Sequence, residues 1–114
     1  MNLFSVKDRV IVITGATGVL GRAMVSHFAE EGAKVVMLGR NVQRGTQIAE
    51  KARAAGGEAV FLATDVLDRT RLEGSYDAIM NMYGRIDVLI NAAGGNMPGA
   101  TIAPDKTFFD LDTD

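Results

Sequence analysis

The sequence has 114 residues, of which 47% are hydrophobic and 23% charged, so it suffices for one packed domain (residues 1–114) but hardly for two. Twelve basic against fourteen acidic residues give a formal charge of −2, which leaves no electrostatic footprint for a nucleic acid partner. Cysteine is absent and histidine occurs once, which excludes disulfides and multi-histidine metal sites and favours a reducing, cytoplasmic location.

Four short apolar runs are predicted to be strands. Their hydrophobic character is nearly continuous rather than alternating, which is typical of parallel strands with helices on both faces. Each is far shorter than the roughly 20 residues that cross a bilayer, so no membrane partner is predicted. The runs are residues 10–13, 35–38, 59–63 and 86–90.

Three segments with helical spacing separate these strands. The first is predicted to stop at Gly32, and the second to begin after Asn41 as N-cap and to stop at Gly56. The third is predicted to start near Asp68 and to end before Gly84. The residues expected to face inward are Leu20, Ala23, Met24, His27 and Phe28 in the first helix, Ile48, Ala49, Ala52 and Ala55 in the second, and Leu72, Tyr76, Ile79 and Tyr83 in the third.

This alternation of strands and helices predicts an α/β fold with a doubly wound parallel sheet, because crossovers between parallel strands are right-handed. After Ile90 the pattern changes to a segment with three glycines and two prolines. We expect a loop there, with another helix starting around residues 107–111.

A glycine-rich turn occupies residues 14–21, Thr-Gly-Ala-Thr-Gly-Val-Leu-Gly, between the first strand and the first helix. Gly15 permits a tight turn, Gly18 lets backbone N–H groups approach a pyrophosphate, and Gly21 lets the helix pack on the strand. The phosphate would then lie at the positive end of the helix dipole. In this context the turn indicates dinucleotide binding, the alternative being a tight connection without a ligand. No Lys-Ser or Lys-Thr follows, which argues against a phosphate loop of the NTPase kind.

The second strand ends in Gly39-Arg40-Asn41, without the carboxylate that would bind the ribose 2′-hydroxyl of NAD. The Arg40 guanidinium is suited to a 2′-phosphate, which favours NADP over NAD. Two alternatives remain open. Arg40 would be a solvated loop cation in one, and the room beside Gly39 would admit NAD in the other.

Two more candidate motifs follow the third and fourth strands. The carboxylate of Asp65, which precedes Val66, is placed to accept from an adenine amino group, and the alternative is that Asp65 or Asp68 caps the next helix. The small residues from Asn91 through Ala92 to Gly94 would let a nicotinamide ribose approach the backbone. The alternative is a structural turn in which Asn91 bridges neighbouring strands.

In this order and spacing, the three motifs resemble those of the short-chain dehydrogenase/reductase family. The resemblance implies a Rossmann-type domain that binds NAD(H) or NADP(H), transfers hydride between the cofactor and an alcohol or carbonyl, and forms homo-oligomers. The predicted cofactor-binding residues are Gly15, Thr17, Gly18, Val19, Leu20, Arg40, Asp65, Val66, Asn91, Ala92 and Gly94.

The motifs depart from the usual family pattern in two places. The G-x-x-G-x-x-G spacing is also that of the extended, epimerase-like branch, and Ala92 replaces the second Asn of the usual Asn-Asn-Ala-Gly. Residues 93–101 and 108–111, with Gly-Val-Leu-Gly at 18–21, resemble D-mannonate oxidoreductases and fructuronate reductases of the family. That resemblance implies a sugar acid or polyol as substrate.

The family's catalytic Ser, Tyr and Lys have no counterpart here, so no catalytic residue is assigned. Tyr76 and Tyr83 are followed four residues later by Met80 and Asp87, and Ser75 reads as a helix-surface serine. In the family these groups come later in the chain. The sequence therefore resembles the N-terminal half of such an enzyme, truncated after the fourth strand, and is not expected to catalyse hydride transfer alone.

A fourth strand ending the sheet would be apolar and unpaired at an edge, and we therefore expect self-association, either by edge pairing or by burial of the exposed sheet face against a second copy. Two other functions stay open on the sequence. One is a non-catalytic nucleotide-binding or regulatory module, and the other is a fragment of an extended-type epimerase or reductase.

Overall fold

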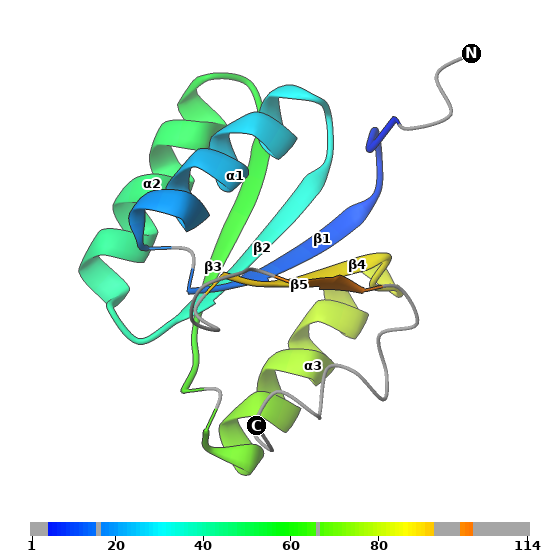
Figure 1. Cartoon of the computed structure of the whole chain (residues 1–114). Coiled ribbons are helices and arrows are strands. Elements are labelled where there is room, and N and C mark those ends of the chain that lie inside the picture. The colour runs from blue at the N-terminus through cyan, green and yellow to red at the C-terminus, as the bar shows by residue number, and fades with distance from the viewer. Residues whose placement is uncertain (1–4, 16, 66, 93–98, 102–114) are drawn as a thin grey trace.

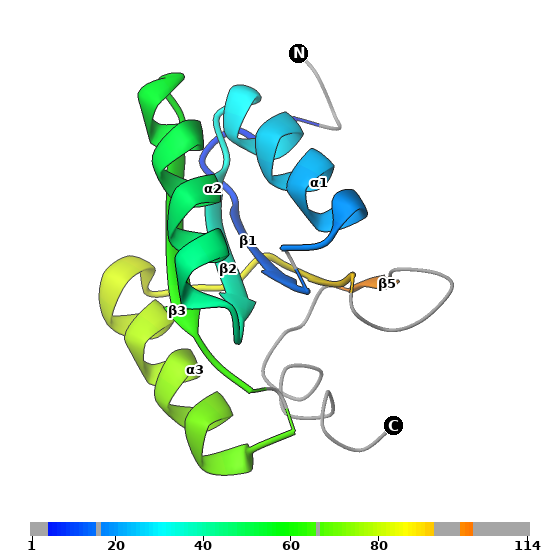
Figure 2. The ribbon, with the colours of Figure 1, turned by 90° about the vertical axis from the view of Figure 1, so that its left-hand side faces the viewer.

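The computed structural model describes residues 5–15, 17–65, 67–92 and 99–101. They form one sheet in the order β3-β2-β1-β4-β5. Helices α1 and α2 cover one face and α3 covers the other (Figures 1 and 2). The elements are β1 (Val10–Thr14), α1 (Val19–Glu30), β2 (Lys34–Gly39), α2 (Val42–Ala54), β3 (Glu58–Ala63), α3 (Arg69–Tyr83), β4 (Val88–Asn91) and β5 (Gly99–Thr101). The predicted doubly wound, Rossmann-type α/β arrangement is confirmed.

The sequence predicted that the sheet would end at the fourth strand, but the structure adds a fifth strand beside it. β5 pairs antiparallel with β4, in a register that places Ala100 beside Ile90, whereas the other three pairs are parallel. An antiparallel partner needs only a short return of the chain rather than a helical crossover, which is why the strand pattern alone did not indicate it. β4 is therefore paired on both sides, so an unpaired β4 edge is no longer a reason to expect self-association.

The helix ends follow their local signals. The Asn41 side chain accepts a hydrogen bond from the Arg44 N–H at 3.0 Å, and that of Asp68 accepts one from the Arg71 N–H at 3.2 Å. Both are the predicted N-caps. α3 ends at Gly84, whose φ of +74° lies in the left-handed region that glycine adopts without strain.

The inward face of α1 differs from the predicted one. The buried residues are Gly21, Val25 and Ala29, whereas Leu20 is 47% exposed. A glycine followed by small and branched residues at i, i+4 and i+8 lets the helix backbone approach the sheet closely. Of the residues predicted to face inward, Met24 and Phe28 are partly buried against the same cluster, whereas Leu20, Ala23 and His27 are exposed.

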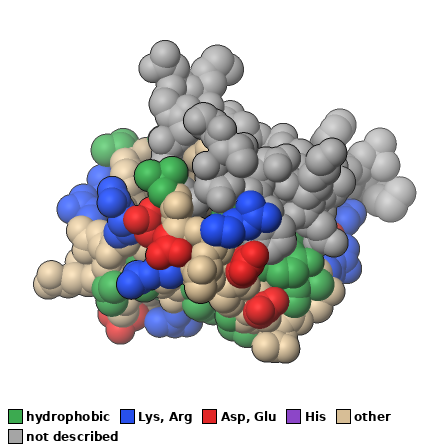
Figure 3. All heavy atoms as spheres, turned by 90° about the horizontal axis from the view of Figure 1, so that it is seen from below, with side chains coloured by type: hydrophobic (Ala, Val, Ile, Leu, Met, Phe, Trp, Pro, Cys, Tyr) green, Lys and Arg blue, Asp and Glu red, His purple; other side chains and the backbone are tan. Residues whose placement is uncertain are grey.

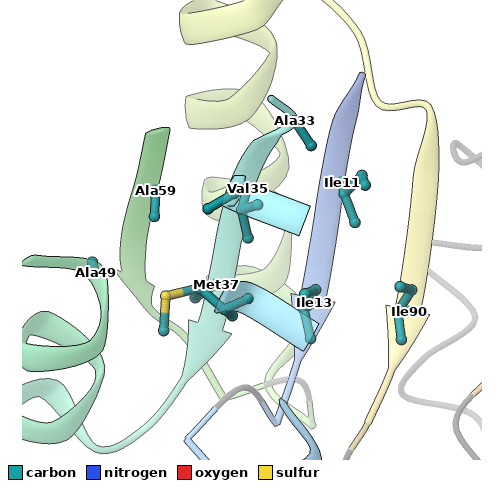
Figure 4. Packing of buried hydrophobic residues seen from close by; sticks show 10 residues of the cluster. Ile11, Ile13, Ala33, Val35, Met37, Ala49, Ala59 and Ile90 are labelled. Atoms are coloured by element: carbon teal, nitrogen blue, oxygen red, sulfur yellow. The ribbon is translucent and has the colours of Figure 1, made fainter. Parts of the chain in front are cut away.

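Alternate residues of the same strands build two hydrophobic clusters, one on each face of the sheet. The cluster beneath α1 and α2 is drawn in Figure 4, where side chains from β1, β2, β3 and β4 meet. Its buried members are Ile11, Ile13, Val25, Ala29, Ala33, Val35, Met37, Ala49, Ala59 and Ile90. The cluster beneath α3 contains Val10, Val12, Val36, Leu38, Leu72, Ile79, Ile86 and Leu89. Burial on both faces explains the nearly continuous apolar runs.

Ser75 is buried, at 7% exposure, so its assignment to the helix surface was wrong. Its hydroxyl shares a hydrogen bond with that of Thr64, which is 2% exposed and follows β3. A small side chain with a partner inside the protein can be buried at little cost, so α3 packs closely on the sheet here.

The carboxylate of Asp87 ties β1 to β4 at the amino edge of the sheet, the edge where the parallel strands begin. Its Oδ2 accepts from the Val10 N–H at 2.8 Å, and its Oδ1 accepts from Arg85 Nε at 3.0 Å, with Arg9 at 3.8 Å. Burial by itself raises the pKa of Asp87, but the hydrogen bonds from Arg85 and Val10 and the two positive charges outweigh it and lower the pKa. The ionised form stabilises the fold at neutral pH, and that contribution is lost as the pH falls from 3.8 through the lowered folded-state pKa.

Tyr83 closes the same edge beneath β2 and β3. Its hydroxyl donates to Glu58 Oε2 at 2.8 Å, and the Lys34 ammonium lies 5.8 Å from the ring centroid. Burial, followed by the hydrogen bond to Glu58 and the negative charge of Glu58, raises the pKa of Tyr83 to about 12.

This raised pKa predicts a loss of stability at high pH. Because the ordinary pKa is 10.0 and the folded one about 12, the protonated phenol is favoured in the folded state. Its contribution is complete below pH 10 and disappears as the pH rises through 12. The chain has two tyrosines, so in a Tyr76→Phe variant the tyrosinate absorbance reports Tyr83 alone. We expect it to titrate near 12 and, after Glu58→Gln, at a lower pH that stays above 10 because burial is the largest cause of the shift; titration near 10 before that change would contradict the assignment.

Candidate cofactor site

The carboxyl ends of β1, β2, β3 and β4 meet at one edge of the sheet, opposite the edge closed by Asp87 and Tyr83. β1 lies between β2 and β4, so the direction in which strands are added reverses beside β1. In open α/β sheets, ligands bind outside the carboxyl ends of the strands at such a switch point. The loops at this edge are therefore the candidate site.

The glycine turn leaves β1 with Gly15 at φ +70°, a conformation that side chains with a Cβ rarely adopt. The Gly15 N–H donates to the Leu38 carbonyl at 3.2 Å, and the Gly18 N–H donates to the Gly15 carbonyl at 3.2 Å. The turn is thus held against the end of β2. This confirms the tight turn for which a glycine at position 15 was predicted.

Within the part of the chain that the structure describes, the first turn of α1 presents backbone donors without a side-chain acceptor at its cap. Gly18 is the N-cap, makes no side-chain cap hydrogen bond, and is followed by no acidic residue in the first turn. The first intrahelical bond runs from the Arg22 N–H to the Gly18 carbonyl at 2.9 Å, so the preceding N–H groups have no partner within the helix. Together with the helix dipole, they favour an anion. Val19 and Leu20, 78% and 47% exposed, lie on the open side of this turn.

A side-chain pair joins the ends of β1 and β4. The buried Thr14 hydroxyl donates to Asn91 Oδ1 at 2.9 Å, and the Ala92 N–H donates to the Thr14 carbonyl at 3.0 Å. Asn91 therefore bridges neighbouring strands, as the structural alternative held, and Ala92 follows at the same edge. Thr14 was missed as a site residue, because its pairing depends on a strand register that spans 77 positions. Gly94 lies outside the described residues.

Arg40 follows β2 and is exposed. It makes no hydrogen bond or ion pair with any residue that the structure describes. The preceding residue is anchored, since the Gly39 carbonyl accepts from the Thr64 N–H at 2.8 Å. The guanidinium therefore stands beside the edge without a charge partner in the described part of the chain.

Asp65 is half-buried after β3. Its Oδ1 accepts from the Leu67 N–H at 3.0 Å, and its carbonyl accepts from the Asp68 N–H at 2.9 Å. Asp68, not Asp65, caps α3. The capping alternative is thus wrong for Asp65, which instead shapes the turn at the site edge; Val66 lies outside the described residues.

Thr17 completes the group, since its methyl carbon lies 4.0 Å from the position of an ideal Cβ on Gly39. The structure therefore brings nine of the eleven predicted cofactor-binding residues to one edge, the other two being outside the described residues. The nine are Gly15, Thr17, Gly18, Val19, Leu20, Arg40, Asp65, Asn91 and Ala92.

A separate groove of about 600 Å³ runs between α1 and α2 and reaches Val19 at one end. Small side chains such as Ala23, Ser26 and Ala52 line much of it. Because it lies between the helices rather than at the strand ends, we do not place the cofactor there.

Other kinds of site find little support in the described residues. They contain no group of three side chains able to hold a metal ion, and none of their helices has the length and hydrophobicity of a membrane span. The face shown in Figure 3 mixes basic and acidic side chains. Arg69 pairs with Glu73, and Arg71 with Asp68, each at 3.6 Å.

Three comparisons with known proteins agree with this geometry. The oxidoreductase UxuB of Bacillus subtilis, itself uncharacterized, is 40% identical over 112 residues, which cover 91% of this chain and 40% of that protein. A structure from Haemophilus influenza, provisionally a D-mannonate oxidoreductase, has bound NAD; its TM-score is 0.76 at 31% identity, over 82% of this chain and 33% of that one. A metagenomic short-chain oxidoreductase in complex with NADP has a TM-score of 0.71 at 32% identity, over 75% of this chain and 38% of that one.

The chain thus spans 40% or less of the length of each of these three proteins. The family model for short chain dehydrogenases matches residues 9–111, which include every strand and helix described above. The chain therefore belongs to the short-chain dehydrogenase family.

Proposed function

We propose that this chain binds a nicotinamide dinucleotide at the carboxyl edge of its sheet, as the cofactor-binding portion of an oxidoreductase. The observation that carries the proposal is the N-terminus of α1, which follows the glycine turn and has no side-chain cap. Its backbone N–H groups and the helix dipole favour the binding of an anion there. The NAD and NADP complexes of similar structures support it.

Each loop at the edge then has a role. The first-turn N–H groups after Gly18 would bind the pyrophosphate, and the Asp65 carboxylate would accept from the adenine amino group. Asn91 and Ala92 would border the nicotinamide ribose. Arg40 would pair with a 2′-phosphate, so we expect NADPH to bind more tightly than NADH.

The bound cofactor would supply the hydride, and this chain's residues would bind and orient it. The proposed parent reaction interconverts an alcohol and a carbonyl, with a sugar acid or polyol as substrate. The Tyr83 hydroxyl donates to Glu58 at the opposite edge of the sheet, and Tyr76, on α3, packs against the hydrophobic cluster between that helix and the sheet. Neither is placed as an acid or base beside the cofactor, and we therefore expect this chain alone to bind the cofactor without turnover.

The cofactor assignment is tested by titrating the chain with NADPH and with NADH, using calorimetry or nucleotide fluorescence. Arg40→Ala is expected to weaken NADPH binding by about tenfold or more, because a charge-assisted hydrogen bond contributes roughly 1.5–3 kcal/mol. NADH binding should change little. Lys51→Ala removes one exposed cation from the later part of α2 and is the matched control, expected to leave both affinities unchanged.

The possible failures are separable. If the unaltered chain binds neither nucleotide, the cofactor proposal is wrong. If it binds both and Arg40→Ala leaves the NADPH affinity unchanged, only the 2′-phosphate role of Arg40 is wrong.

A further inference from the structure

The aromatic ring of Phe61 in β3 packs against Gly39, where the link between β2 and α2 begins, and against Gly45 in the first turn of α2. An ideal Cβ on Gly39 would lie 3.5 Å from the ring's Cε1. One on Gly45, in the first turn of α2, would lie 2.7 Å from Cγ and closer still to two other ring carbons. The ring thus fills the space that a side chain at position 45 would need, and the helix backbone rests directly on it.

The link is held at both ends by backbone and cap hydrogen bonds as well. The Thr64 N–H donates to the Gly39 carbonyl at 2.8 Å, and the Gly45 N–H donates to the Asn41 carbonyl at 2.9 Å. Arg40 is the middle residue of this short link. Since its side chain has no partner among the described residues, the backbone at Gly39 and Asn41 decides where the guanidinium can reach.

The same ring also places the link relative to the glycine turn. The ideal Cβ position on Gly39 that approaches the Phe61 ring lies 4.0 Å from the Thr17 methyl carbon. The end of β2 at Gly39 therefore lies between the Phe61 ring and the glycine turn. A shift of the ring is transmitted to the end of β2 on the side that faces the candidate cofactor.

We propose that Phe61 is a positioning residue for cofactor discrimination, an inference that rests on the proposed function. The rigid ring fixes the Gly39–Asn41 link so that Arg40 faces the 2′-position of the adenosine ribose. A smaller, flexible side chain leaves a gap beneath Gly39 and Gly45, and the link gains freedom. The guanidinium then loses its fixed approach to a 2′-phosphate, while the backbone donors of α1 keep the pyrophosphate.

The test compares Phe61→Leu with Val35→Ala, using NADPH and NADH as probes. Val35 is fully buried in the same cluster but stands near the amino end of β2, away from the link. Both variants are expected to lower the melting temperature. Phe61→Leu alone is expected to reduce the ratio of NADH to NADPH dissociation constants by about threefold or more, largely through weaker NADPH binding.

The outcomes separate the positioning role of Phe61 from the proposed cofactor binding on which it rests. If Phe61→Leu and Val35→Ala leave the ratio equally unchanged, Phe61 has a structural role only and the inference is wrong. If the unaltered chain binds neither nucleotide, the proposed function fails and the positioning role with it. A ratio that falls in Phe61→Leu and stays constant in Val35→Ala supports the inference, because a general loss of stability does not separate two cofactors.

Discussion

Gly18→Ala is expected to weaken the binding of both NADPH and NADH by at least tenfold, with a loss of less than about 1 kcal/mol in the free energy of unfolding, because alanine is a poorer N-cap than glycine. An ideal Cβ at position 18 lies 3.6 Å from the Gly15 carbonyl oxygen, which is an ordinary contact distance. The backbone φ there is −76°, which alanine adopts freely. The fold therefore accepts the methyl group, but a phosphate approaching the first-turn N–H groups would meet it.

Gly15→Ala is the contrasting variant. At φ +70° a Cβ brings steric strain, so we expect a loss of about 1–2 kcal/mol in the free energy of unfolding. Denaturant unfolding and nucleotide titration of both variants separate the two roles of glycine in one turn. Full nucleotide affinity in Gly18→Ala would contradict a pyrophosphate at the start of α1.

Gly45→Ala and Gly74→Ala are expected to change stability in opposite directions, although both place alanine within a helix. Alanine is favoured over glycine in a helix by about 1 kcal/mol. At position 74 an ideal Cβ meets no described atom of another segment within 4 Å, so we expect a gain of about 0.5–1 kcal/mol. At position 45 it would overlap the Phe61 ring, and we expect a net loss of about 1–3 kcal/mol.

Thermal unfolding measures both changes, since 1 kcal/mol shifts the melting temperature of a domain near this size by about 4–8 °C. The double variant Gly45→Ala with Phe61→Leu tests the cause. A smaller side chain at position 61 should recover part of the loss from Gly45→Ala. Equal melting temperatures for Gly45→Ala and Gly74→Ala would show that the ring is not fixed against α2.

Local signals predicted the parts of the fold that depend on a few neighbouring residues. Asn41 and Asp68 cap the helices that they precede, and Gly84 ends α3, because a side-chain acceptor or a left-handed glycine acts over one turn. The burial of Ser75 was not predictable in this way. It depends on Thr64 being brought beside α3 by the packing of that helix on the sheet.

The residues of the candidate site likewise fall into those that local sequence signals predicted and those that depend on contacts between distant strands. Gly15, Arg40 and Asp65 were identified because parallel strands end at one edge, and position after a strand is a property of the sequence. The hydrogen bond of Thr14 to Asn91, and the contacts of the Phe61 ring, require the register between strands. A period-two or period-3.6 pattern carries no information on that register when every strand is buried on both faces.

The place of β1 between β2 and β4 has a consequence for the order of events during synthesis. Its partner β2 begins at Lys34, 20 residues after Thr14. Its other partner, β4, ends at Asn91, which is 77 positions after Thr14. At translation rates of about 5–20 residues per second, the second partner emerges roughly 4–15 seconds after β1. Through that interval the hydrogen-bonding edge of an apolar strand is open to other chains. A nascent chain of this topology is therefore most prone to aggregate before β4 is made, and a chaperone would act in that interval.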